Sequence, residues 1–146
     1  MILKLKLYEI VNAAQVFDKL CETKSPSRVT HWIMKNIKII RDDCLFFEKD
    51  RMRIINEYIQ YDSSGSCSVK DNDGNELKDE NGNPMLNYKD INKKSEYMNE
   101  IDKLNNLEIE ISPYVLDYCK VADESPNYSI EPMYLVSLMD KFIKVD

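Results

Sequence analysis

The stretch IMKNIKIIRDDCLFFEKDRMRIINEYIQY, residues 33–61, repeats one spacing of apolar side chains from end to end. Successive members lie four or three residues apart: Ile33, Ile37, Ile40, Cys44, Phe47, Arg51, Ile54, Tyr58 and Tyr61. This spacing keeps one seam of an α-helix on the same side over many turns. The stretch therefore predicts a single long helix, from Pro26 to Tyr61, with a length of about 54 Å.

Further apolar residues widen the seam on both sides. Val29, Trp32, Ile39 and Phe46 flank it on one side, and Met52, Ile55 and Ile59 flank it on the other. An arc of this width is typical of a helix that packs against several neighbours in a bundle. Arg51 is the one charged member of the seam. Its guanidinium either pairs with a carboxylate of a neighbouring helix or reaches water while its stem packs, and the second interpretation is favoured.

Two short segments alternate between apolar and charged residues, as half-buried strands do. Residues 2–8 place Lys4 and Lys6 between leucines, and residues 107–111 place Glu108 and Glu110 between apolar residues. We expect the two segments to pair, with lysines opposite glutamates. Apolar periodicity also predicts helices at 9–23, 90–105 and 113–122, and a final helix that starts at Ser129 or Glu131.

The stretch 67–89 has a different character. Asp73-Gly74 and Asn81-Gly82 favour the positive backbone angles of tight hairpin turns, and Pro84 restricts any strand to an edge. We expect a small exposed β-hairpin or meander, and we find no internal repeat. The predicted fold is mainly α, of the α+β kind: one domain, 1–146, built as a helical bundle around the long helix. It carries a projecting hairpin at about 67–89 and a short terminal strand pair.

Composition excludes several classes of protein. The 43% hydrophobic content supports a core, and the net charge of −6 disfavours direct nucleic-acid binding. Lys35, Lys38 and Arg41 form a local basic patch on the long helix, for which a solvated helix face is the favoured interpretation. Lysines interrupt the apolar start of the chain, so we expect no signal peptide, and no run approaches the ~18 apolar residues of a membrane span.

No pattern in the chain points to catalysis, a metal or a cofactor. Its four cysteines form no C-x-x-C pair and fit free thiols in a reducing cytoplasm. His31, the only histidine, has no neighbouring nucleophile and acid in the spacing of a catalytic triad. In the acidic stretch around Gly74, neither EF-hand register supplies a carboxylate at both ends of the loop. We therefore expect a protein that is not an enzyme.

The acidic hairpin supplies candidate partner-binding residues. They are Asp71, Asp73, Glu76, Asp79 and Glu80. Complementary charge on a basic protein surface would attract them. For the paired carboxylates Asp42-Asp43, Asp79-Glu80 and Asp123-Glu124, a solvated face is the favoured interpretation. The alternative is phosphate mimicry, in which the acidic side occupies a nucleic-acid groove on a host protein.

The chain resembles an uncharacterised family of small proteins from phages and prophages of low-GC Gram-positive bacteria. The resemblance rests on Ser25-Pro26-Ser27-Arg28 entering a long charged helix that closes with Ile54-Ile55-Asn56-Glu57-Tyr58. It continues through the Asp-, Gly- and Asn-rich stretch 71–83 and the strand 107–111. It covers roughly residues 2–112 and implies a phage gene product made in the host bacterial cytoplasm. It carries over no functional residues.

Two functional hypotheses follow. The first is a phage-encoded, non-enzymatic inhibitor of a host protein, such as a CRISPR effector or another defence component. The alternative is a virion or tail-assembly accessory protein, for which the seam at 33–61 would serve self-association or a coiled-coil partner. Both hypotheses place the binding partner among host or phage proteins.

Overall fold

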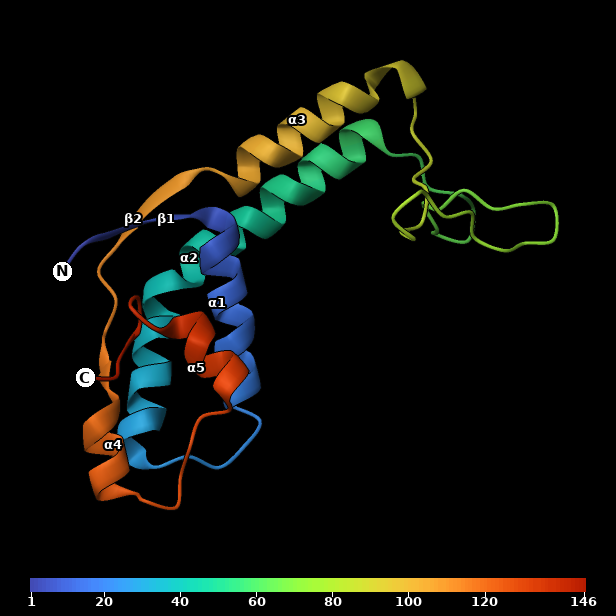
Figure 1. The fold of residues 1–146 in the computed structure, drawn as a ribbon. Coiled ribbons are helices and arrows are strands. Elements are labelled where there is room, and N and C mark those ends of the chain that lie inside the picture. Colours follow the sequence, from blue (N-terminus) through green and yellow to red (C-terminus); the bar gives the residue numbers. More distant parts are fainter. The chain divides into compact units, whose positions relative to one another are not determined.

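The computed structural model describes residues 1–146, which divide into two compact units. The first unit comprises Met1–Glu48 and Asn105–Asp146, and the second comprises Lys49–Leu104. The regular structure is mainly helical, with two sheets of two strands each, so the predicted mainly α class with a small β part is confirmed. The long helix α2, Ser27–Tyr58, contributes to both units (Figure 1).

The predicted seam is buried at three positions, Ile33, Ile40 and Ile54, each at most 2% exposed, where other parts of the chain cover it. From Arg41 to Arg53 every residue of α2 is half-buried or exposed. Arg51 is exposed, in agreement with a guanidinium that reaches water, and Tyr61 lies beyond the end of α2.

An aromatic cluster forms the centre of the first unit. Phe17 of α1, Leu7–Leu20, lies edge-on to Trp32 of α2 at 5.2 Å and to Phe142 at 5.3 Å between ring centroids. All three rings are fully buried, and the Trp32 indole Nε1 donates to the Phe142 carbonyl at 3.0 Å. The cluster therefore joins α1, α2 and the C-terminal segment.

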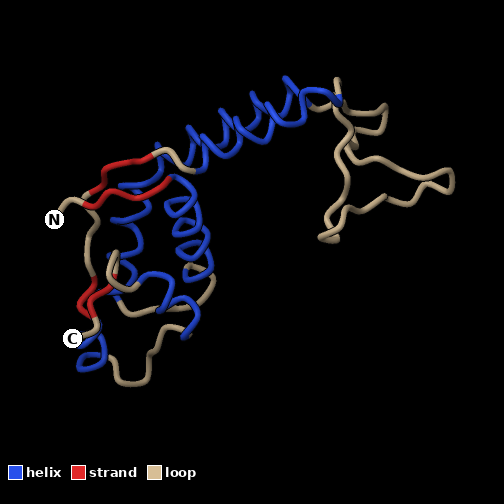
Figure 2. Tube along the Cα trace, turned by 45° about the horizontal axis from the view of Figure 1, so that its top comes forward, coloured by secondary structure: helices blue, strands red, loops and turns tan.

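Two small sheets complete the first unit (Figure 2). Strands β1, Leu3–Lys6, and β2, Glu108–Ile111, pair antiparallel, with Lys4 opposite Glu110 and Lys6 opposite Glu108. The predicted pairing and its register are thus confirmed. The second sheet joins β3, Leu116–Asp117, to β4, Ile143–Lys144, in parallel and was not predicted.

The helix predicted at 113–122 is wrong in its first half. The chain is extended there, and α4 begins only at Tyr118 and runs to Glu124, with the Asp117 carboxylate accepting from the Cys119 and Lys120 amides. The physical reason is Asn36, whose side chain is fully buried. It accepts a hydrogen bond from the Tyr114 amide at 3.0 Å and donates one to the Tyr114 carbonyl at 2.8 Å. These backbone groups are therefore already bonded and do not form helical hydrogen bonds.

The last helix begins next to the predicted start at Glu131 and is short. Helix α5 spans Pro132–Leu138, and Asp140, at a φ of 66°, turns the chain into β4. Met133 and Val136, which the helical pattern assigns to the core, are 68% and 70% exposed. A helix of about two turns presents only one narrow stripe to its neighbours, and Leu138 occupies that stripe.

In the second unit, the end of α2 packs against α3, Lys94–Asn105, which follows the short 3₁₀ helix η1, Ile91–Lys93 (Figure 1). The buried Tyr97 ring lies 5.9 Å from the Tyr58 ring and 5.6 Å from the Tyr88 ring. The Asp90 carboxylate caps η1 through the Asn92 amide, which confirms Asp90 as the start of this helical segment. Residues 60–90 form neither a helix nor a named strand.

Replacing Phe17 with alanine is expected to lower the free energy of unfolding by about 3–5 kcal/mol, because it leaves a cavity beside Trp32 and Phe142. Urea unfolding followed by the fluorescence of Trp32, the single tryptophan, measures the change. Val136→Ala, on the exposed side of α5, serves as the control and should change stability by no more than about 0.5 kcal/mol. Equal effects of the two variants would contradict the aromatic cluster as the centre of the core.

Replacing Asn36 with leucine is expected to destabilise the protein by about 2 kcal/mol or more, because the Tyr114 amide and carbonyl lose their buried partners. The exposed Asn12→Leu is the matched control. Amide hydrogen exchange at Tyr114 should accelerate in the first variant and stay unchanged in the second. A wild-type exchange rate at Tyr114 in Asn36→Leu would show that this side chain does not hold the segment.

Candidate functional site

Residues 60–88, here called the three-turn segment, contain a repeated turn. The repeats are Asp62-Ser63-Ser64-Gly65-Ser66, Asp71-Asn72-Asp73-Gly74-Asn75 and Asp79-Glu80-Asn81-Gly82-Asn83. Each begins with aspartate and has glycine in fourth place. The expectation of no internal repeat was therefore wrong, and the spacing of Asp and Gly was the signal for it.

The three turns share one hydrogen-bond pattern. In the second, the Asp71 Oδ1 accepts from the Asp73 and Asn75 amides, both at 2.9 Å, and the Gly74 amide donates to the Asp71 carbonyl at 3.1 Å. The other two turns repeat these bonds around the first aspartate of each. The three glycines have φ between 80° and 83°, as in a three-residue hairpin loop, so the predicted positive angles at Gly74 and Gly82 are confirmed.

A closed ring of backbone hydrogen bonds links the turns. The Leu77 amide donates to the Val69 carbonyl at 2.9 Å, the Met85 amide to Leu77 at 2.9 Å, and the Val69 amide to Met85 at 2.8 Å. Only isolated bridges accompany the ring, such as that between Lys70 and Glu76. The segment is thus held by polar bonds rather than by a buried core.

The five predicted carboxylates are all exposed, but they have different roles. Asp71 and Asp79 hold their turns, and Glu76 accepts from the Ser68 hydroxyl at 3.2 Å. Asp73 and Glu80 lie inside the turns and make no side-chain hydrogen bond or ion pair within the chain. These two carboxylates are free to meet a partner.

The pKa of Asp62 lies below its ordinary value, chiefly because its carboxylate accepts from the Ser64 hydroxyl and the Ser66 amide. These bonds favour the charged form, so they stabilise the first turn at neutral pH and are lost as the pH falls through the lowered pKa.

Sequence reasoning missed the apolar part of the three-turn segment. Leu77 is 40% exposed and Met85 is 43% exposed, while Val69 is half-buried. These residues form the backbone ring, so their side chains originate close together. The signal was an apolar residue two positions before Asp71 and again before Asp79.

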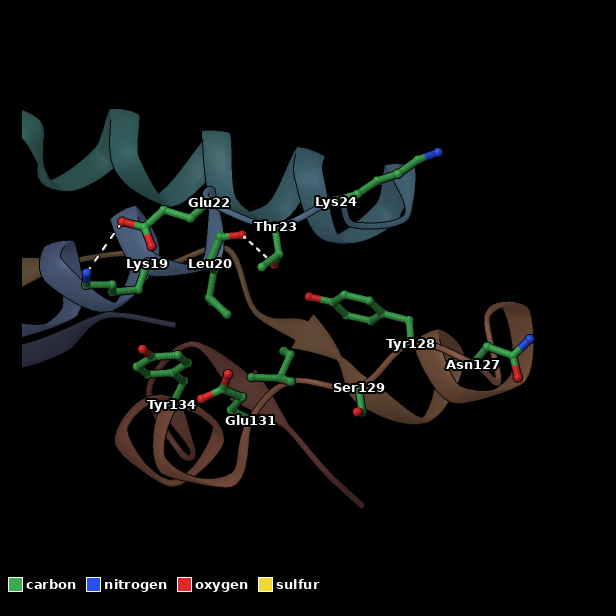
Figure 3. A pocket seen from close by; sticks show the side chains of 11 residues that line it. Lys19, Leu20, Glu22, Thr23, Lys24, Asn127, Tyr128, Ser129, Glu131 and Tyr134 are labelled. Carbon is green, nitrogen blue, oxygen red and sulfur yellow. Dashed lines mark hydrogen bonds and ion pairs between the residues drawn. The ribbon is translucent and has the colours of Figure 1, made fainter.

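The first unit has a separate hollow of about 370 Å³ between the end of α1 and the segment that joins α4 to α5 (Figure 3). Its charges are mixed: Lys19 pairs with Glu22 at 3.4 Å, while Lys24 and Glu131 also line it. Burial raises the pKa of Tyr128, whose ring lies across the hollow. The hollow offers hydrogen bonds to a polar molecule but no preference for one sign of charge.

His31 lies on the exposed surface of α2, with its ring 5.5 Å from the Tyr114 ring and nearly perpendicular to it. The neighbouring Thr30 hydroxyl bonds to Ser25 and to the Pro26 carbonyl. The described residues contain no group of three histidine, cysteine or acidic side chains placed to hold a metal ion. No helix combines the length and the apolar character that crossing a bilayer requires.

Comparison with protein-family models, curated proteins and solved structures gave no match for this chain. The resemblance to a phage family therefore stays an expectation.

Replacing Asp79 with alanine is expected to open the third turn, because the Asn81 and Asn83 amides lose their acceptor. The matched variant Glu80→Ala removes a neighbouring carboxylate that caps nothing. Amide hydrogen exchange should accelerate at Asn81 and Asn83 by about fivefold or more in Asp79→Ala, the equivalent of one lost hydrogen bond. Equal exchange in the two variants would refute the capping role of Asp79.

Proposed function

We propose that this chain is a non-enzymatic interaction protein whose three-turn segment binds a basic surface of a partner protein. The single observation that carries the proposal is the order of this segment in the absence of a core. Every residue from Lys70 to Met85 is exposed, yet backbone and aspartate hydrogen bonds define the conformation. A connection of this length is usually either functional or a disordered linker, and the hydrogen bonds of this segment favour the first.

The composition of the segment fits an interface. Leu77 and Met85 supply a small apolar centre, while Asp73 and Glu80 supply charge around it. Protein interfaces combine an apolar core with a polar rim, and a standard interface uses about 20–30 residues per partner, which the segment matches. Preformed turns reduce the ordering entropy that binding would otherwise require.

Free carboxylates favour a partner with lysine or arginine at the docking surface. Such pairs steer the encounter and set the orientation of the complex. In the phage context that the resemblance implies, this partner is a host protein in the bacterial cytoplasm. A defence component with a nucleic-acid groove, such as a CRISPR effector, would present the required basic surface.

The proposal is tested by charge reversal at the two free carboxylates, Asp73→Lys with Glu80→Lys, which leaves Asp71 and Asp79 in place. Affinity capture from a low-GC Gram-positive lysate, read by mass spectrometry, identifies the partner of the wild-type protein. The reversed variant should then bind that purified partner about tenfold or more weakly, because two attractive charges become repulsive.

The matched control is Asp18→Lys with Asp123→Lys, which makes the same change in net charge on exposed positions of the first unit. It should bind the partner as the wild type does. If both variants weaken binding equally, the loss of affinity is due to net charge and not to the three-turn segment. If the reversed variant binds as tightly as the wild type, the three-turn segment is not the binding site. Capture of virion or tail proteins alone would favour the assembly alternative.

A further inference from the structure

One face of α2 in the first unit carries basic side chains that the proposed function does not use. Arg28, His31, Lys35 and Lys38 are spaced by three and four residues, so they share this face, and no acidic residue occurs from Thr23 to Arg41. Arg28 is committed to Glu124, with its Nε 2.8 Å from the carboxylate. Lys35 and Lys38 make no hydrogen bond or ion pair within the chain.

The two free lysines line a hollow of about 430 Å³, here called the α2 groove. Its lining consists of Lys35, Lys38, Ile39, Ser112, Pro113 and Tyr114. The hollow is open to solvent, so a ligand bound there would keep part of its surface in water. Besides the two lysines, the only titratable side chain of this lining is the phenol of Tyr114. The groove therefore favours an anion.

The opposite wall of the α2 groove is held in place. Asn36, on the next position of α2, binds both the amide and the carbonyl of Tyr114 from the interior. The Ser112 hydroxyl donates to the Met1 carbonyl at 3.0 Å. His31 supports the Tyr114 ring, which remains 44% exposed. A wall held by hydrogen bonds opposite two unpaired ammonium groups is a favourable arrangement for binding a small ligand.

We propose that the α2 groove binds a nucleotide, with its phosphate groups at Lys35 and Lys38 and its base against the apolar wall. Ammonium groups are regular phosphate ligands, and two of them one helical turn apart match the charge of a phosphate ester. Pro113, Ile39 and the exposed Tyr114 ring offer the flat apolar contact that a base requires.

The surroundings of the groove favour a short anion over a polyanion. Asp42 follows Lys38 by four residues on the same face of α2, and Glu110 precedes Ser112 by two residues. Both carboxylates are exposed, and they would repel an extended nucleic acid or an acidic peptide that ran past the ends of the groove. The net charge of −6 acts in the same direction.

Titration of the full-length protein with ADP, followed by calorimetry and amide chemical shifts, tests the proposal. ADP should bind with a Kd of about 0.1–1 mM, and the shifts should concentrate at residues 35–39 and 112–114. Adenosine, which lacks the phosphates, should bind at least about tenfold more weakly, and pyrophosphate should compete with ADP.

The variant Lys35→Gln with Lys38→Gln should weaken ADP binding by about tenfold, whereas Lys94→Gln with Lys103→Gln should leave it unchanged. Both pairs remove two exposed charges from helices, and circular dichroism checks that both variants fold. Wild-type affinity in the first variant, shifts centred on the hollow at Tyr128, or no saturable binding would each overturn the proposal. So would tighter binding of a single-stranded oligonucleotide or an oligoglutamate.

Discussion

The structure depends on covering one apolar seam that is longer than a single small core. Helix α2 presents buried residues from Val29 near its start to Ile54 near its end. Hydrophobic burial is the dominant favourable term in folding, so the buried positions near each end of α2 need other elements to cover them. In the first unit α1 and the C-terminal segment cover it through Phe17 and Phe142, and in the second unit α3 covers it through Tyr97.

Arg51 lies three positions after Glu48, where the first unit ends. A charged side chain cannot enter an apolar core without a partner, so an arginine on the seam indicates a point where water reaches the helix. Its exposure agrees with this reading. The periodic pattern of the sequence thus contained both the continuity of α2 and the place where its covering is interrupted.

Regular features of the fold could be predicted because they arise from local periodicity. The helical spacing of the seam and the alternation within β1 and β2 are examples, since both depend only on neighbouring residues; the charge pattern of the two strands then favoured their pairing. The extended segment at Tyr114 could not be predicted in the same way. Ser112-Pro113 is a good helix start by itself, but the distant Asn36 takes both backbone groups of Tyr114.

The position of the candidate interaction site in the chain could be predicted from the sequence, but its hydrogen bonds could not. The aspartate and glycine turn signals located it, whereas the division of its carboxylates into turn-holding and free ones required the hydrogen bonds. Asp71 and Asp73 have the same chemistry and lie two residues apart, yet only Asp71 caps the turn. The closed ring of hydrogen bonds through Val69, Leu77 and Met85 forms only because the chain folds back on itself twice. No short sequence motif encodes this path.

The three-turn segment is ordered without a buried core, and backbone amide relaxation measures this order directly. If the aspartate caps and the backbone ring hold the segment, order parameters across residues 60–88 should be about 0.8, close to those of a rigid backbone. Values below about 0.6 throughout the segment would describe a flexible coil and would contradict the preformed interface.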